Sequence, residues 1–216
     1  MTDLPADPKR VVRAGYDRIS GAYRSDTFEL EGTWYETALA ALTAHLAPGG
    51  SVLDLGCGCG VPVARHLSER FDVTGVDLSD HQIERARGLV PNARFIREDM
   101  TSVDFPDDAF DAVVSFWAII HVPVAEQGAL FDAIARWLRP GGILLITVGG
   151  SAWTGVEDDW FGAPMYWSHG DPDAYAVALA DRRFAVLEEW WIPEDDGGHA
   201  AFLARAPTPD GIGAPR

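Results

Sequence analysis

The stretch VLDLGCGCGVP, residues 52–62, decides how the rest of the chain is interpreted. It overlaps a short apolar run, SVLDL (51–55), which is typical of a buried strand, and a helix-like segment, VPVARHLSER, follows it. Three glycines lie between the two. Glycine permits tight turns and lets a ligand approach the backbone where a Cβ would clash. Strand, glycine turn and helix in this order predict a ligand site beyond the carboxyl end of a parallel strand.

The same turn contains Cys57 and Cys59, the only two cysteines of the chain. Two cysteines this close are no disulfide framework. A structural zinc site needs four ligands, and no second cysteine pair is present to complete one. The six histidines show no metal-binding spacing. We therefore interpret both cysteines as small side chains that fill space around the turn, with a reactive thiol as the less favoured alternative, and we expect no metal ion.

Strands and helices alternate through the middle of the chain. This alternation predicts βαβ units and a doubly wound α/β layer structure with a mostly parallel sheet. Two later runs, 184–192 and 199–206, are separated by the turn-like PEDDGG, so we expect them to pair antiparallel. The other strands are expected at 51–55, 71–78, 93–99, 110–119 and 142–150, and helices at 8–24, 33–46, 79–90, 123–139 and 171–183.

The chain divides into segments of different character. Residues 1–50 are expected to form a helical cap segment, and residues 51–206 the α/β domain. Within that domain residues 151–170 have no clean period and are rich in aromatic residues, which suggests a lid insert. Residues 207–216 are expected to be a flexible tail.

Length and charge restrict the class of partner. A chain of 216 residues suits one domain with a full core. The formal net charge of -16 opposes binding to phosphate backbones, so we expect no nucleic acid. No apolar run is long enough to span a membrane, and the N-terminus lacks the apolar region of a secretion signal. We expect a cytoplasmic monomer or homodimer that acts on a small-molecule substrate.

Two acidic residues refine the expected ligand. Asp54 lies two residues before the turn, and Asp77 ends the second strand, roughly 20 residues further on, where an acid accepts hydrogen bonds from ribose hydroxyls. The acid at the end of the second strand, taken alone, also fits NAD. However, Val61 occupies the place of the third glycine of the dinucleotide motif, and Asp54 would lie near a pyrophosphate. A cofactor with a cationic amino-acid end would instead favour the Asp54 carboxylate.

Five motifs together resemble those of class I S-adenosylmethionine-dependent methyltransferases, in the family's order and spacing. The resemblance covers roughly residues 16–206 and implies a Rossmann-like fold whose seven-stranded sheet has its last strand inserted antiparallel. It also implies S-adenosyl-L-methionine as the cofactor. The motifs are LDLGCGCG (53–60), TGVDLS (74–79), REDM (97–100), FDAVVSFWAIIHV (110–122) and LRPGGILLI (138–146).

By position, the resemblance implies a set of cofactor-binding residues. The glycine turn should contact the methionine end and the sugar, Asp77 the ribose hydroxyls, and Asp99 the adenine amino group. The full implied set is Tyr16, Asp54, Gly56, Gly58, Gly60, Asp77, Leu78, Asp99, Met100, Ser115 and Phe116.

Methyl transfer from a sulfonium needs little catalytic machinery, because the methyl carbon is already activated and positioning supplies much of the rate. A base is required only when the acceptor arrives protonated. Candidates are His121, His169 and Tyr166, and the alternative for each is a purely structural role. The aromatic rings of residues 151–170 suggest a flat or apolar acceptor. The alternative is that these rings pack together as a small separate core under the segment. The expected acceptor-binding residues are Tyr23, Trp117, His121, Trp153, Trp160, Tyr166 and Trp167.

The favoured hypothesis is methyl transfer from S-adenosylmethionine to O or N, possibly C, of a small aromatic or apolar metabolite of specialised metabolism. The alternatives are an NAD-dependent oxidoreductase, a non-catalytic cofactor-binding protein of the same fold, and a fold relative that uses the sulfonium without transferring its methyl group.

Overall fold

A computed structural model describes residues 4–194 and 197–209 of the chain. The last seven residues of the expected flexible tail, 210–216, lie outside the described residues. Within the described part, no helix combines the length and the apolar character needed to cross a membrane.

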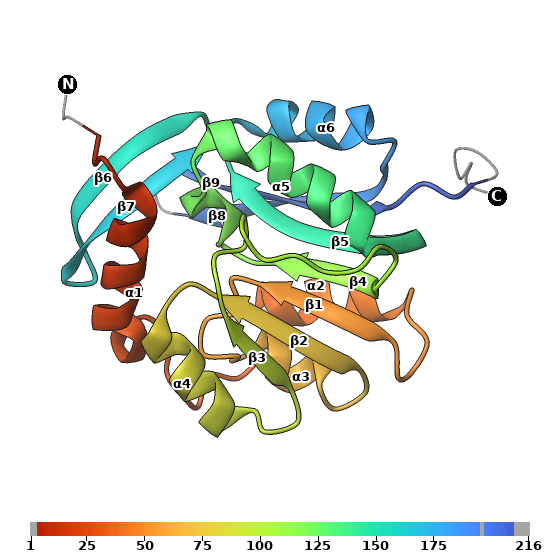
Figure 1. Ribbon diagram of the computed structural model, residues 1–216, viewed down its shortest axis with the longest axis horizontal. Coiled ribbons are helices and arrows are strands. Elements are labelled where there is room, and N and C mark those ends of the chain that lie inside the picture. Colours follow the sequence, from red (N-terminus) through yellow and green to blue (C-terminus); the bar gives the residue numbers. More distant parts are fainter. Residues whose placement is uncertain (1–3, 195–196, 210–216) are drawn as a thin grey trace.

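A seven-stranded sheet forms the centre of the molecule (Figure 1). Its strands run in the order β3-β2-β1-β4-β5-β9-β8. Strands β1 to β5 are mutually parallel, and β9 lies antiparallel between β5 and β8. The expected fold class, including the antiparallel last strand, is confirmed. The strands span Ser51–Leu55 (β1), Asp72–Asp77 (β2), Arg94–Arg97 (β3), Phe110–Ser115 (β4), Leu138–Gly149 (β5), Ala185–Glu194 (β8) and Gly197–Arg205 (β9).

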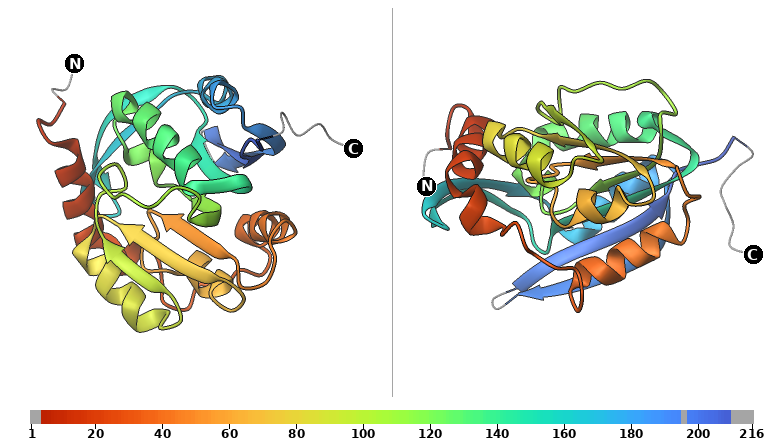
Figure 2. Two further views of the ribbon diagram at one scale, coloured as in Figure 1. Left: turned by 45° about the vertical axis from the view of Figure 1, so that its right-hand side comes forward. Right: turned by 90° about the horizontal axis from the view of Figure 1, so that it is seen from below.

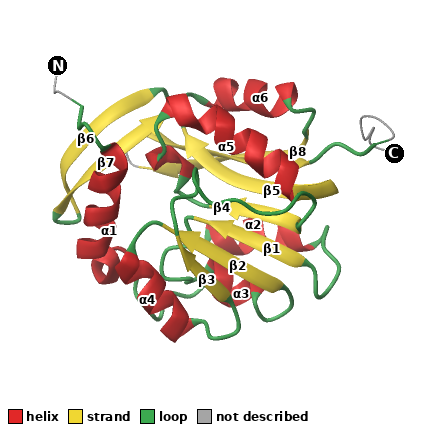
Figure 3. Ribbon diagram, in the orientation of Figure 1, coloured by secondary structure: helices red, strands yellow, loops and turns green. Residues whose placement is uncertain are grey.

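Helices cover both faces of this sheet because its inner strands are apolar on both sides (Figure 3). In β1, Leu53 and Leu55 pack in the core on the side of α5 (Val124–Trp137) and α6 (Pro172–Asp181). Val52 packs in the opposite core. Figure 2 shows α5 and α2 on opposite sides of the sheet. The helices of that opposite core are α2 (Trp34–Thr43), α3 (Val63–Leu67) and α4 (Asp80–Leu89).

The chain order places a switch point beside β1. From β1 the chain builds outward to β2 and β3 on one side, and β4 and β5 extend the sheet on the other. Loops after β1 and β4 therefore diverge at their carboxyl ends and leave a crevice there, which is where doubly wound sheets bind ligands.

The N-terminal helix α1 (Pro8–Tyr23) lies across this end of the sheet, beside a hairpin of β6 (Trp153–Trp160) and β7 (Ala163–His169) (Figure 1). Asp7 caps α1 by accepting a hydrogen bond from the Arg10 amide. A small apolar core that includes Val12, Ile19 and Met165 joins α1 to the hairpin.

Two local details differ from the sequence expectations. The aromatic segment 151–170 is a regular hairpin, although a shifted register between Glu157 and Trp160 interrupts the alternation that would have indicated strands. Helix α5 ends at Trp137, and β5 already begins at Leu138, before the expected strand at 142–150. Leu138 pairs with Phe110, and the register then shifts before the next pair, Ala112 and Ile143.

Candidate functional site

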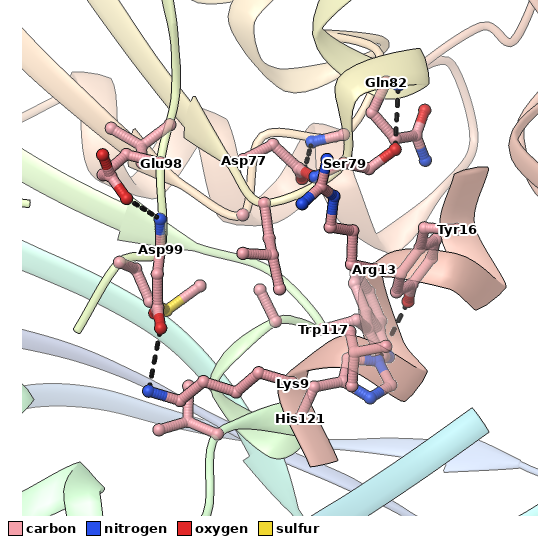
Figure 4. Close-up of a pocket in the computed structure, with 18 of the residues that line it drawn as sticks. Lys9, Arg13, Tyr16, Asp77, Ser79, Gln82, Glu98, Asp99, Trp117 and His121 are labelled. Atoms are coloured by element: carbon pink, nitrogen blue, oxygen red, sulfur yellow. Dashed lines mark hydrogen bonds and ion pairs between the residues drawn. The ribbon is translucent and has the colours of Figure 1, made fainter. Parts of the chain in front are cut away.

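A cavity with about 710 Å³ of empty space lies at the switch point, between the carboxyl ends of β1, β2 and β4 and helix α1 (Figure 4). We call it the larger cavity, to distinguish it from a smaller one that adjoins it. Its lining residues are Lys9, Val12, Arg13, Tyr16, Tyr23, Gly56, Gly58, Val76, Asp77, Leu78, Ser79, Gln82, Glu98, Asp99, Met100, Phe116, Trp117, Ala118, His121 and Val122.

A smaller cavity with about 400 Å³ of empty space adjoins it. Because five residues line both cavities, the two are parts of one cleft: Tyr23, Gly56, Gly58, Gln82 and Phe116. The other residues of the smaller cavity are Arg24, Tyr35, Asp54, Cys57, Cys59, Val61, Pro62 and Val63.

The glycine turn forms the floor between the cavities. Gly56 and Gly58 have φ values of 73° and 54°, a region that side-chain-bearing residues avoid. A Cβ on Gly56 would lie 2.1 Å from the Cβ of Ala118, whereas a Cβ on Gly58 would meet no atom closer than 3.8 Å. Gly58 therefore keeps space open for a ligand. Gly60 lines neither cavity, and its missing Cβ instead makes room for Val90 and Phe95.

Asp77 connects this turn to the start of α4. Its two carboxylate oxygens accept hydrogen bonds from the amides of Gly58 and Ser79, each over 2.9 Å. Burial raises the pKa of Asp77 to about 6, although these amide bonds oppose the shift. The carboxylate thus fixes the turn while facing the larger cavity.

Asp54 is the most unusual group of the cleft. It is only 2% exposed, and its Oδ2 atom is buried without a hydrogen-bond partner. Burial, followed by the nearby Asp77 carboxylate, raises the pKa of Asp54 to about 8. An unsatisfied buried carboxyl group costs free energy, and a cationic ligand group would relieve that cost. The smaller cavity therefore fits a ligand with a positive end.

At the opposite end of the cleft, Asp99 is held by the only lysine of the chain. Lys9 Nζ lies 2.8 Å from Asp99 Oδ2 and also contacts Glu126. Asp99 Oδ1 accepts hydrogen bonds from the amide and hydroxyl of Thr101. These bonds tie the first turn of α1 to the loop after β3, beside Met100.

His121 links three segments next to the cavity. Its Nδ1 lies 2.7 Å from the carbonyl oxygen of Tyr166, which only accepts, so Nδ1 carries the proton. Burial lowers the pKa of His121 to about 4 and keeps the ring neutral. Nε2 is therefore an acceptor, and the Tyr16 hydroxyl donates to it over 2.9 Å. The Trp167 ring lies 4.4 Å from the imidazole, between centroids.

Trp117 contributes an aromatic wall after β4. Its φ is 51°, which is rare for a bulky residue, and its amide donates to the hydroxyl of Thr147. The neighbouring Phe116 ring is stacked at 6.1 Å between centroids. Tyr16 and Tyr23 complete this apolar part of the larger cavity.

Several residues expected at the site line neither cavity. The Ser115 hydroxyl donates to the Leu55 carbonyl and so joins β4 to β1. His169 donates from Nδ1 to the Ser151 carbonyl over 2.6 Å, at the far end of the hairpin. Trp153 is 45% exposed. Tyr166, Trp160 and Trp167 belong to the core between α1 and the hairpin, and Trp160 and Trp167 pack around Tyr16 and His121.

Sequence reasoning also missed lining residues. Those on α1 had no recognisable spacing toward the glycine turn, because only the tertiary fold brings the helix over the cleft. Gln82 follows the Ser79 cap of α4 by three residues, and its position one turn into a helix after β2 was the only available signal. The missed polar residues are Lys9, Arg13, Arg24, Tyr35, Ser79, Gln82 and Glu98.

Both cysteines are buried and free, and burial raises the pKa of the Cys57 thiol. Among residues 4–194 and 197–209, no group of three or more His, Cys, Asp or Glu side chains is arranged to hold a metal ion. The geometry therefore favours a glycine turn that carries two packed thiols.

Comparison with known proteins identifies relatives of this chain. Residues 52–142 match a family model described as a methyltransferase domain. The chain is 35% identical over 134 residues to the sterol 24-C-methyltransferase of Yarrowia lipolytica, covering 58% of this chain and 34% of that protein. It is 41% identical over 138 residues to phosphoethanolamine N-methyltransferase 3 of Arabidopsis thaliana, and this match covers 61% of this chain and 27% of that protein. The matched segments thus span about a third or less of these relatives.

A solved structure matches the whole fold. The 1,6-didemethyltoxoflavin-N1-methyltransferase of Burkholderia thailandensis, with bound 1,6-didemethyltoxoflavin and S-adenosylhomocysteine, superposes with a TM-score of 0.71 at 22% identity. The match covers 95% of this chain and 93% of that one. The family model and these relatives therefore point to a methyltransferase domain over the central part of the chain, and the solved structure shows the same fold.

Proposed function

We propose that this protein transfers a methyl group from S-adenosylmethionine to O or N, possibly C, of a small aromatic or apolar metabolite of specialised metabolism. The observation that carries the proposal is the unpartnered, buried Asp54 carboxyl group at the glycine turn. A nicotinamide dinucleotide would bring phosphates toward this group, whereas the ammonium of a methionine moiety would pair with it.

The residues of the cleft fit the cofactor in order. Asp54, Gly56 and Gly58 would hold the methionine end, and Asp77 the ribose. Leu78, Asp99 and Met100 line the part of the larger cavity that would hold the adenine. When bound, S-adenosylmethionine supplies an activated methyl carbon.

The chain's own contribution to the reaction would be positioning and exclusion of water. Tyr16, Tyr23, Phe116 and Trp117 offer ring faces and few polar atoms to an acceptor, which supports a flat or apolar substrate. In this proposal residues 1–50 act as the cap of the 51–206 domain, and the hairpin within 151–170 supports α1 from outside.

A proton leaving the acceptor would go to the Tyr16–His121 pair. His121 is neutral, and its Nε2 already accepts from the Tyr16 hydroxyl, which lines the cavity. In that step the Tyr16 oxygen would take the proton of the acceptor, while the hydrogen of the Tyr16 hydroxyl would move to Nε2 of His121. His169 lies away from the cleft and has no such path.

Calorimetric titration with S-adenosylhomocysteine, with NAD in parallel, tests the cofactor. We expect saturable binding of the first and none of the second, and weaker binding of the first by Asp54→Asn. Transfer of labelled methyl into small-molecule pools then tests the reaction. Tight NAD binding alone would favour an oxidoreductase. Cofactor binding without transfer to any pool would favour a non-catalytic or sulfonium-using relative.

A further inference from the structure

The hairpin of β6 and β7 ends in a turn that does not suit one of its residues. Trp160 pairs with Ala163, so Phe161 and Gly162 form the turn between them. Both turn residues have positive φ, 53° and 94°. A two-residue hairpin turn with positive φ at both positions favours the sequence Asn-Gly, because a bulky side chain is unfavourable in that region. Phe161 therefore introduces backbone strain at the tip of the hairpin.

Burial does not compensate for this strain. Phe161 is 58% exposed, so much of its ring remains in contact with water. The ring meets Trp160 at 5.0 Å and Tyr23 at 5.9 Å between centroids, edge to face in both pairs. A bulky residue that keeps an unfavourable φ while its ring stays exposed is a candidate for a functional contact, since such strain gathers at ligand-binding positions.

Tyr23 connects the tip of the hairpin to the cleft. It lines both cavities, and its ring meets the Tyr16 ring at 5.5 Å between centroids. Tyr16 in turn lines the larger cavity and donates to His121. Phe161 lines neither cavity, so it lies on the outer side of Tyr23. Tyr16, Tyr23 and Phe161 thus form a continuous aromatic row from the larger cavity to the exposed tip. Figure 1 shows the hairpin beside α1, from which Tyr16 and Tyr23 come.

We propose that Phe161 contacts the outer ring of the methyl acceptor and selects acceptors with at least two fused planar rings. This inference rests on the proposed function, because it needs an acceptor in the same cleft. There the cofactor would occupy the stretch from Asp54 to Asp99, which leaves the aromatic row for the acceptor. A ring fused to the reacting one would extend outward along Tyr23 to the exposed Phe161 side chain, and a single ring would not reach it. Ring contacts of this kind add to affinity beyond the area that they bury.

Two neutral dyes whose emission depends on the polarity of their surroundings test the assignment. Prodan has two fused rings, and dimethylaminobenzonitrile has one. Each is titrated into wild type and Phe161→Asn, both saturated with S-adenosylhomocysteine. We expect wild type to bind Prodan saturably and Phe161→Asn to lose at least about fivefold in affinity for it. The affinities of the variant for the one-ring dye and for S-adenosylhomocysteine should stay within about twofold of wild type.

The stability of Phe161→Asn provides a second readout with a definite sign. The substitution gives the turn its favoured sequence, Asn-Gly, so the midpoint of urea denaturation should rise. A residue that served only to pack the tip would show the opposite, because its loss would remove the contacts with Trp160 and Tyr23. Higher stability together with weaker binding of Prodan is the combination expected of a strained binding residue.

Two control variants separate these effects. Trp191→Asn removes another exposed ring, 53% exposed, which lies against Gly150 and Gly198 and lines neither cavity. It should bind both dyes like wild type, which excludes adhesion of the dyes to any exposed ring. Arg183→Asn relieves another positive φ, 61°, at a residue that follows α6 and lines neither cavity. It should raise the urea midpoint and leave both dye affinities unchanged.

Three results would overturn the assignment. They are unchanged affinity of Phe161→Asn for Prodan, an equal loss for both dyes, and a wild-type complex that binds S-adenosylhomocysteine but not Prodan. A lower urea midpoint with unchanged dye affinity would make Phe161 a structural residue of the tip. If wild type does not bind S-adenosylhomocysteine, the proposed function itself fails. If it does, and Phe161→Asn shows no selective loss, only the role of Phe161 fails.

Discussion

The Tyr16 hydroxyl donates a hydrogen bond to Nε2 of His121 across 2.9 Å. This bond joins α1 to η1 (Ile119–His121), the short helical turn that follows β4. The same imidazole donates from Nδ1 to the carbonyl of Tyr166 in β7. One buried ring therefore connects three segments that are remote in sequence, and each of them borders the cleft or supports its wall.

Tyr16→Phe should weaken this connection. The substitution leaves Nε2 of His121 buried without a donor, so we expect the free energy of unfolding to fall by about 1–3 kcal/mol. Affinity for S-adenosylhomocysteine should also fall several-fold, because Tyr16 lines the cavity. Urea denaturation and calorimetry measure the two effects.

Tyr175→Phe is the control for this variant. It also removes a buried hydroxyl, which donates to Gln127 over 2.9 Å, but lines neither cavity. It should lose stability and keep its ligand affinity. The same affinity in Tyr16→Phe as in wild type would contradict a role for Tyr16 in holding the cleft.

Asp54 should make the protein less stable as the pH rises. Its pKa is about 8 in the folded state against an ordinary value of 3.8, so between these values the folded state binds more protons than the unfolded state. Stability from this group is therefore present at low pH and is lost as the pH rises toward 8. Asp54→Asn should exceed wild type in stability at pH 8, by more than about 1 kcal/mol.

This gain should shrink toward pH 4, which urea denaturation across the range would measure. Asp72→Asn, at an exposed position, is the control for the loss of an acidic side chain. A stability difference between Asp54→Asn and wild type that does not vary with pH would show that the Asp54 carboxyl is not buried as described.

Gly58→Ala should separate folding from binding. Gly58 and Gly32 both have positive φ, 54° and 73°, and neither has an atom closer than 3.8 Å to an added Cβ. Alanine at either position should therefore cost a similar 1–2 kcal/mol of stability, roughly the penalty of the left-handed region. Only Gly58 borders the cleft, so only Gly58→Ala should lose ligand affinity in calorimetric titration. Equal affinity in both variants would argue against a ligand at the turn.

The two cysteines should be chemically silent in the folded protein. Both are buried, and the raised pKa of Cys57 keeps its thiol protonated. Iodoacetamide at pH 8 should label them only after denaturation, as mass spectrometry would detect. Cys57→Ala and Cys59→Ala should keep ligand affinity and turnover largely intact. Loss of turnover in either variant with the fold retained would assign the thiol a function.

Much of the central fold could be predicted because its signals are local. Strands β1, β4 and β5 each contain a short apolar run, and a glycine turn follows β1 while the helix cap Ser79 follows β2. Asp54 and Asp77 could be placed at the cleft for the same reason, since strand ends of a parallel sheet share one edge. The hairpin was harder to predict, because its bulge and mixed exposure hide the alternation of strands.

The sequence by itself determined the layer architecture, the glycine turn and the acidic residues beside it, because periodicity and strand ends are properties of neighbouring residues. Only the tertiary structure decided what faces them. Lys9, Arg13 and Arg24 reach the cleft because α1 packs on the hairpin, and His121 is committed to Tyr16 while His169 is turned away. The contact between Tyr16 and His121 joins residues 105 positions apart in the sequence. Folding also buries the Oδ2 atom of Asp54 without a hydrogen-bond partner.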